Sequence, residues 1–249
     1  MRLACLVLLV AVCLEGCVSV LPKQAFDADG RAEIRTIAIT TIENPRGLTI
    51  RRYNPVYAII GTSGILMQQA AMAQKSAHYK ARVGDLIPQS NHFLLDVLQS
   101  GLTEQGYKVH TLDIGFWQSM KLLHAHQLPA VDALLRVKIE RLGFRAGSIS
   151  APYKPSVVVS VQLIRADISR EILYEDTLSI GYKSTYHMTM LDDNGQDYSY
   201  PRLSDLMQHA LQSKPGLFIA LRHAADRINH DLEKNHRTLL VKADSTPSD

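Results

Sequence analysis

The residue whose position indicates the most definite chemistry is Cys17, because its thiol directly follows a short apolar run at the N-terminus. Arg2 provides a positive start, residues 3–14 carry no charge, and the small residue Gly16 precedes the cysteine. This is the arrangement of a secretory signal peptide with its cleavage site. A membrane-spanning helix needs roughly 20 apolar residues, so the run is too short to be a transmembrane anchor. The sequence therefore predicts an exported protein.

The motif Leu14-Glu15-Gly16-Cys17 resembles the lipobox of bacterial lipoproteins. The resemblance implies that residues 1–16 are a signal peptide, that Cys17 becomes the first residue of the mature chain, and that its thiol carries lipid. Residues 17–32 would then form a lipidated tether between the membrane and the fold. Val18 stands where an aspartate would resemble the inner-membrane retention signal. The implied location is the outer membrane, with the protein anchored by lipid and facing the periplasm.

Composition excludes several functional classes. All three cysteines, at positions 5, 13 and 17, lie in the leader, so the remaining chain offers no thiol nucleophile or cysteine metal site. Hydrophobic residues make up 46% and charged residues 20% of the 249-residue chain, as in globular proteins. The net charge of +3 is dispersed, without the basic run of a nucleic-acid binder. We therefore expect no nucleic-acid partner.

The common catalytic motifs are absent from the sequence. It has no Gly-x-Ser-x-Gly elbow, no phosphate-binding Walker loop and no His-Glu-x-x-His motif. The polar groups that come closest to a metal site have a simpler interpretation as hydrated surface or as a turn. These groups are His124 with His126, His223 with Asp226 and His230, and the acidic run 192–197. We expect no catalytic residue, no metal and no cofactor.

Hydrophobic periodicity predicts a mixed succession of strands and helices. Strands are expected over 33–44, 107–112, 131–144, 157–166 and 172–182, and helices over 90–105, 116–127, 204–212 and 216–234. In the helix 90–105, Ser90 is the expected N-cap and Gly106 the expected C-terminal glycine. The predicted fold class is α/β (α+β), a single mixed β-sheet of about five strands flanked by helices. This domain would span residues 33–240, before a disordered tail over 241–249.

An unusual stretch from residue 53 to residue 74 contains no charged side chain. We treat residues 53–82 as a helical insertion in the domain. Small residues permit close helix packing, and flanking cations suit a membrane interface. The stretch is interpreted either as a helix packed against the domain or a flexible insertion, or as a contact with membrane or another subunit. Its candidate interaction residues are Ile59, Ile60, Gly61, Gly64, Ile65 and Leu66.

A second candidate surface is a tyrosine-rich excursion after the last predicted strand. It contains Tyr182, Tyr186, Tyr198 and Tyr200. Tyrosine is enriched at protein interfaces, which favours a recognition surface. The alternative is a loop whose rings fold back onto the sheet.

The order of these elements resembles the small α/β domains of envelope lipoproteins of the CsgG and LpoB type, and the N-terminal domain of TolB. The resemblance rests on Gly106-Tyr107 after a helix, on Val131-Asp132-Ala133-Leu134-Leu135 entering a strand, and on the hairpin between residues 163 and 174. It implies a non-catalytic adaptor, assembly or regulatory factor that binds an envelope protein. Two alternatives stay open: an envelope hydrolase with an unrecognised active site, and a subunit of an oligomeric export channel, which would be a homo-oligomer.

Overall fold

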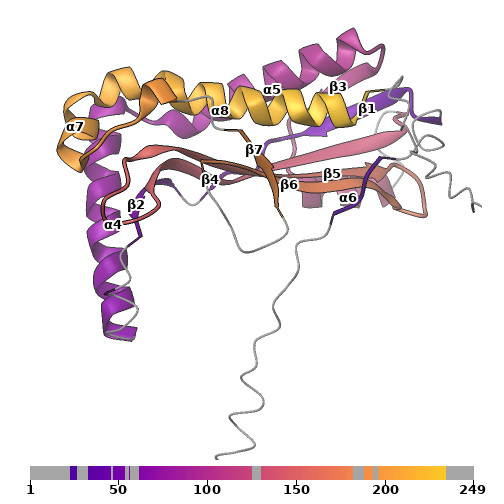
Figure 1. Cartoon of the computed structure of the whole chain (residues 1–249). Coiled ribbons are helices and arrows are strands. Elements are labelled where there is room, and N and C mark those ends of the chain that lie inside the picture. The colour runs from indigo at the N-terminus through magenta and orange to yellow at the C-terminus, as the bar shows by residue number, and fades with distance from the viewer. Residues whose placement is uncertain are drawn as a thin grey trace, which may run out of the picture.

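The computed structural model describes residues 23–26, 33–45, 47–53, 56, 62–124, 130–181, 188–192 and 196–233. These residues form one mixed sheet of seven strands together with five α-helices (Figure 1). The predicted fold class is therefore confirmed, although the sheet has two more strands than expected. The strands are β1 (Thr36–Thr40), β2 (Leu48–Arg52), β3 (Lys108–Leu112), β4 (Ala133–Ala146), β5 (Lys154–Arg165), β6 (Ile172–Ile180) and β7 (Thr189–Leu191). The helices are α4 (Thr62–Val83), α5 (Leu86–Glu104), α6 (Phe116–His124), α7 (Leu203–Gln208) and α8 (Ala210–Asp231), with a short 3-10 helix η1 (Gln196–Tyr198) before α7.

The long strand β4 organises the sheet, whose order is β3-β1-β4-β5-β6-β7. The first half of β4 pairs in parallel with β1, and its second half pairs in parallel with β2, which lies off the main path. Its other edge runs antiparallel to β5, which in turn pairs antiparallel with β6. The carboxylate of Asp132, just before β4, accepts hydrogen bonds from the backbone amides of Arg35 and Thr36 at 2.8 and 2.7 Å. Asp132 thereby joins the starts of β4 and β1.

A β-bulge in β4 divides the strand into two registers. Up to Ile139 the side chains of β4 alternate between the two faces of the sheet. Val137 and Ile139 are buried against the helices, while Arg136 and Lys138 are on the opposite face. The pairing with β5 shifts between Ile139 and Arg141, so Leu142 and Phe144 become the buried residues of the second half. An extra residue in one strand has this effect because side chains alternate with a period of two.

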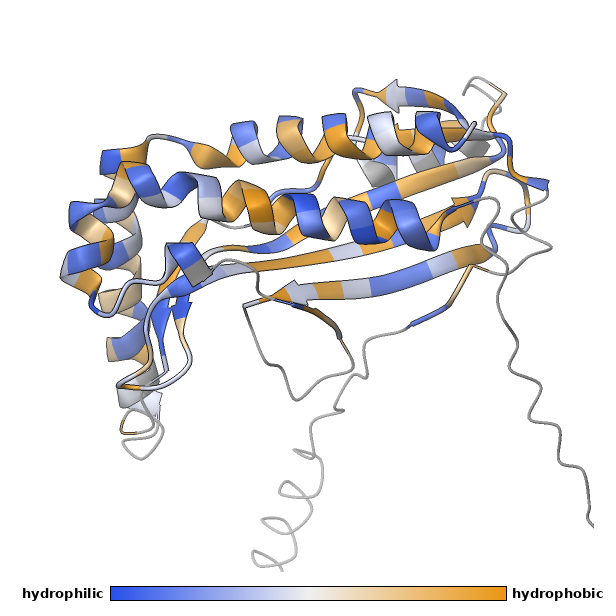
Figure 2. Ribbon diagram, turned by 45° about the horizontal axis from the view of Figure 1, so that its top comes forward, coloured by the Kyte–Doolittle hydropathy of each residue, from blue (hydrophilic) through white to orange (hydrophobic). Residues whose placement is uncertain are grey.

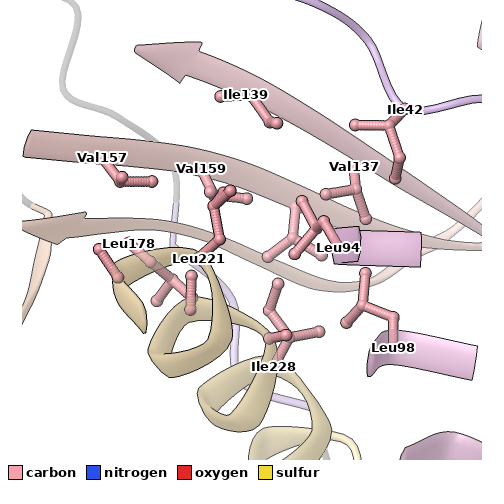
Figure 3. Packing of buried hydrophobic residues seen from close by; sticks show 14 of the residues in the cluster. Ile42, Leu94, Leu98, Val137, Ile139, Val157, Val159, Leu178, Leu221 and Ile228 are labelled. Carbon is pink, nitrogen blue, oxygen red and sulfur yellow. The ribbon is translucent and has the colours of Figure 1, made fainter. Parts of the chain in front are cut away.

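Helices α5 and α8 cover one face of the sheet (Figure 1). Their apolar residues meet those of the strands beneath them, as the hydropathy colouring indicates (Figure 2). In the centre of this layer, Leu94 and Leu98 of α5 and Leu221 and Ile228 of α8 pack with side chains of β4, β5 and β6 (Figure 3). All four helical side chains are fully buried. This layer is the core of the molecule.

Helix boundaries differ from the prediction at their N-terminal ends. Helix α5 begins at Leu86, and Asp85 is its N-cap because the Asp85 carboxylate accepts a bond from the Ile87 amide at 3.3 Å. The prediction of Ser90 as the N-cap is wrong, because Ser90 lies buried inside the helix. Pro88 lies in the first turn of α5, where proline is tolerated, so it is compatible with this earlier start. Gly106 is confirmed as the C-terminal glycine, with a φ of 84°.

The chain also departs from the predicted pattern around α8. This helix starts at Ala210 and continues through Pro215 to Asp231, whereas the prediction ends one helix at residue 212 and begins the next at residue 216. The predicted helix end at residues 125–127 and the predicted end at residue 234 lie outside the described residues. Among the described residues, no helix is both long and apolar enough to cross a bilayer.

Candidate functional site

Several predicted site residues lie outside the part of the chain that the structure describes. These are Cys17, Ile59, Ile60, Gly61, Tyr182 and Tyr186. Lipidation of Cys17 and binding by the other five stay predictions.

Residues 62–74 of the charge-free stretch form the first half of α4, where Gly64, Ile65 and Leu66 lie. Gly64 is buried, whereas the side chain of Leu66 is 64% exposed. The second half of α4 belongs to the core through Tyr79 and Val83. The predicted insertion is therefore a helix with one packed half and one projecting half.

The two described tyrosines of the second candidate surface pack against the fold. Tyr200 pairs through its backbone with Tyr153, at 2.7 and 2.9 Å, and its ring lies 6.1 Å from that of Phe144. Tyr198 lies against α8, since a Cβ atom on Gly216 would come within 2.6 Å of its Cγ atom. These contacts give both residues a structural role, and a partner contact through them stays a prediction.

An apolar groove on the outer surface of α5 and α8 is the feature that sequence reasoning missed. It has a volume of about 530 Å³. Helix α5 contributes two of its lining residues, and one face of α8 contributes the others. The lining residues are Gln89, Phe93, Leu211, Lys214, Pro215, Phe218, Ile219 and Arg222.

Close packing of the two helices positions this groove. Gly101 of α5 lies so near Asn229 of α8 that an added Cβ atom would be 2.1 Å from the Asn229 amide nitrogen. The same amide nitrogen donates to the Val97 carbonyl at 3.2 Å, and Gln105 donates to the Asn229 carbonyl at 2.7 Å. Because Leu94 and Leu98 face the sheet, the neighbouring Phe93 is turned toward the outer surface.

Aromatic rings and cations give the groove its chemical character. The rings of Phe93 and Phe218 meet edge to face, with centroids 5.2 Å apart. The Arg222 guanidinium lies 5.4 Å from the centre of the Phe93 ring, within the range of a cation–π contact. Lys214 adds a second cation, and none of the described residues that line the groove is acidic. Apolar walls with two cations suit an apolar group that carries a negative charge.

Pro215 adds an acceptor to this site. Proline has no backbone N–H, so the Leu211 carbonyl cannot receive the usual helical hydrogen bond from residue 215. Leu211 itself is 61% exposed at the groove. A ligand could therefore donate a hydrogen bond to this carbonyl while its acceptor groups bind Lys214 and Arg222.

A smaller hollow of about 210 Å³ lies on the strands of the sheet, and its charges are paired internally. Arg136 binds Glu43 with two nitrogens, at 2.7 and 3.1 Å, and reaches Gln162 at 3.2 Å. Gln162 donates in turn to Glu175. The ring of Trp117, from α6, lies 5.7 Å from the Arg136 guanidinium, so α6 lies over this polar face. The network explains the hollow as part of the sheet's own stabilisation.

Other polar pairs join secondary-structure elements. The Tyr79 hydroxyl lies 2.6 Å from the Ser213 hydroxyl and links α4 to α8, and burial raises the pKa of Tyr79 to about 12. The Tyr174 hydroxyl donates to Asp231 at 2.9 Å, and burial followed by the nearby Asp231 charge raises the pKa of Tyr174. His223, Asp226 and His230 belong to no metal-binding group of three or more ligands among the described residues.

One signal in the sequence could have pointed to the groove. The buried stripe of α8 runs through Leu217 and Leu221, and that of α5 runs through Leu94 and Leu98. Phe93 and Phe218 each lie one residue away from a stripe position, about 100° around the helix. A large aromatic residue beside the stripe on two helices indicates an apolar surface outside the core. That the two surfaces meet depends on tertiary structure.

Comparison with known proteins gives partial structural likenesses. No family model and no curated protein matches the sequence. Among solved structures, a dodecamer of a PelC point variant from Paraburkholderia phytofirmans matches with a TM-score of 0.30 and 12% identity, covering 80% of this chain and 94% of that one. Lipoprotein GNA1162 from Neisseria meningitidis matches with a TM-score of 0.30 and 15% identity, covering 61% and 88%. Protein XCC0632 from Xanthomonas campestris, of family DUF330, matches with a TM-score of 0.39 and 8% identity, covering 86% and 92%. The chain thus shows a weak structural resemblance to bacterial proteins that include a lipoprotein.

Proposed function

We propose that this chain is a lipid-anchored, non-catalytic binding module of the cell envelope. Its α5–α8 groove would hold an apolar segment of an envelope protein that bears an acidic side chain. The observation that carries the proposal is the apolar groove with Lys214 and Arg222 as its only charged lining residues in the described chain. A carboxylate between these cations would form charge-assisted hydrogen bonds while apolar neighbours fill the space over the two phenylalanines.

The position of the N-terminal segment is compatible with a lipid anchor on Cys17. Gln24 pairs with Glu175 of β6 through two backbone hydrogen bonds, of 2.7 and 2.9 Å, and Lys23 lies 3.6 Å from the buried Asp176. Only five residues lie between Cys17 and Lys23, and an extended chain spans this interval in at most about 20 Å. Residues 23–26 therefore run along the β6 edge of the sheet, where Phe26 is buried in the core. A lipid on Cys17 would hold this edge of the domain near the membrane.

The anchor has a direct test. Labelled palmitate should be incorporated into the wild-type chain and not into Cys17→Ser, and only the wild type should stay with membranes after a high-salt wash that releases proteins held by charge. Label on both proteins, or on neither, would contradict the lipid anchor. This result is independent of what the groove binds.

The groove is tested by photocrosslinking in the intact envelope. A benzophenone amino acid replaces Leu211 at the groove or, as the matched control, Ile168, which is 89% exposed in the β5–β6 hairpin. We expect a discrete adduct from position 211 alone. The adduct should disappear when Lys214→Glu and Arg222→Glu are added and persist with Lys214→Arg and Arg222→Lys. An adduct that survives charge reversal, or that forms equally from position 168, would refute the proposed site.

A further inference from the structure

The first half of α4 is an unusual surface for a folded domain. Among its described side chains from Thr62 to Gln74, only Gly64 is buried. The half projects past the sheet, away from α5 and α8 (Figure 1). A side-chain hydrogen bond joins this half to β2, since Gln68 donates to the Arg52 carbonyl at 3.3 Å. Farther along the helix, the Ile50 amide of β2 donates to Ser76 at 3.0 Å.

Apolar side chains gather at this projecting end. Leu66 and Met67 are each 64% exposed, and Val56 and Tyr53, from the segment between β2 and α4, are 49% and 46% exposed. The exposed Ala70, Ala73 and Ala77 continue the face of Leu66 along the helix. A helix face that meets water normally carries charged residues, and this one has none before Lys75.

The surrounding charge is of one sign. Between residues 44 and 84 the sequence has no Asp or Glu and six basic residues: Arg46, Arg51, Arg52, Lys75, Lys80 and Arg82. Lys80 pairs with Asp85 at 3.2 Å, whereas Arg52 donates at 2.8 Å to the uncharged carbonyl of Ile149. Of these cations, Lys75 follows the projecting half directly and Arg52 lies next to Gln68 of that half, so positive charge flanks its exposed apolar residues. This combination favours an anionic phospholipid surface.

The charge also decides between a membrane and a second copy of the chain. Two projecting helices packed face to face would bring two cationic segments together without an acidic partner on either. An anionic bilayer would instead accept the apolar residues and neutralise the cations.

We propose that the projecting half of α4 lies on an anionic membrane surface, with Leu66 and Met67 in the headgroup–acyl boundary. With the lipid that the proposed function places on Cys17, this gives the domain two attachment points and a fixed orientation. An acyl chain with a second membrane signal holds a protein more stably than one chain alone. The groove then stays on the far side of the molecule.

The test measures the surroundings of single side chains in the full processed protein. Met67→Cys or, as the control, Ile168→Cys is labelled with an environment-sensitive nitrobenzoxadiazole dye, and the protein is reconstituted into vesicles. We expect a blue-shifted emission at position 67 that lipid-borne spin labels quench. The shift should occur with phosphatidylglycerol in phosphatidylcholine vesicles and be lost in phosphatidylcholine alone. Position 168 should show neither effect.

Two further results keep the outcome decisive. Lys75→Glu should lower the fraction of membrane-quenched label at position 67 about tenfold, because the charge reversal replaces attraction to the anionic surface with repulsion. Unchanged circular dichroism would show that this variant is folded. A dye at position 67 that lipid spin labels do not quench, or a shift that depends on protein concentration instead of lipid, would overturn the proposal; the second result would identify a second copy as the occupant. Palmitate labelling of Cys17 separates this failure from failure of the anchor.

Discussion

The α5–α8 groove and the projecting half of α4 both expose apolar side chains, but the fold supports them differently. The ring centroids of the groove residues Phe93 and Phe218 lie 5.2 Å apart, and both residues pack against the buried core. Leu66 and Met67 extend from a helix whose own first half has almost no buried side chain. The groove is a shallow hollow on two helices that the core holds in place, suited to an apolar segment of a protein. The projecting helix offers a convex surface, suited to a broad, deformable partner such as a bilayer.

The largest expected loss of unfolding free energy comes from separating β2 from β4, because α4 is attached to the fold through β2. Gly143 lies where β2 crosses close to β4, with a φ of 153°, and an added Cβ atom would be 1.9 Å from the Thr49 carbonyl oxygen. Gly143→Ala must therefore push β2 away from β4, at a cost of about 3 kcal/mol or more in unfolding free energy. Chemical denaturation measures this loss. Hydrogen exchange should show early opening of β2 and α4, and protection in α5 and α8 that resembles wild type would separate the two regions.

Gly147→Ala is the matched control, because nothing lies within 4 Å of a Cβ atom at that position. Its unfolding free energy should stay within about 0.5 kcal/mol of wild type. Equal losses in the two variants would mean that the close approach of β2 and β4 is not what holds α4 in place.

The second effect concerns Tyr79, the residue that fixes the packed half of α4 to α8. In the unfolded chain its phenol loses a proton near pH 10, whereas the pKa in the folded protein is about 12 because of burial. The stabilisation is complete below pH 10 and is lost as pH rises toward 12, up to about 2 to 3 kcal/mol. Denaturation curves of wild type and Tyr79→Phe across this range should differ in slope, with the steeper fall in wild type. Parallel curves would contradict a protonated, buried Tyr79.

The third effect separates packing from ligand binding in the groove. Phe218 is partly buried, so Phe218→Ala should lower the unfolding free energy by about 1 to 2 kcal/mol, less than a fully buried phenylalanine would. The same change should abolish the photocrosslink from position 211. Ile168→Ala, in the exposed hairpin, should change neither quantity. A retained crosslink in Phe218→Ala would show that the aromatic pair does not form the binding surface.

The difference between locally determined and tertiary features explains which parts of the fold could be predicted from the sequence. Residues with strong periodicity, such as Leu94 and Leu98, or the alternating Val137 and Ile139, correctly predicted α5 and β4 because one face of each element is buried. Strand β2 was missed because its five residues, Leu48–Arg52, end in two arginines and owe their conformation to pairing with β4. Strand β7, three residues long, depends in the same way on β6. The groove could not be predicted because it exists only where Phe93 and Phe218, distant in sequence, come together.

The smallest effect on stability should come from the projecting helix. Leu66 is 64% exposed, so Leu66→Asp should change the unfolding free energy by no more than about 0.5 kcal/mol in the absence of membranes. In the unlipidated Cys17→Ser protein the same carboxylate would have to enter an anionic, apolar boundary on vesicles, so flotation with phosphatidylglycerol vesicles should fall about tenfold or more. Leu66→Met, which keeps the apolar volume, serves as the control and should behave as wild type in both assays. A large loss of stability in Leu66→Asp would mean that the side chain is covered by the protein itself, and the membrane interpretation of α4 would fail.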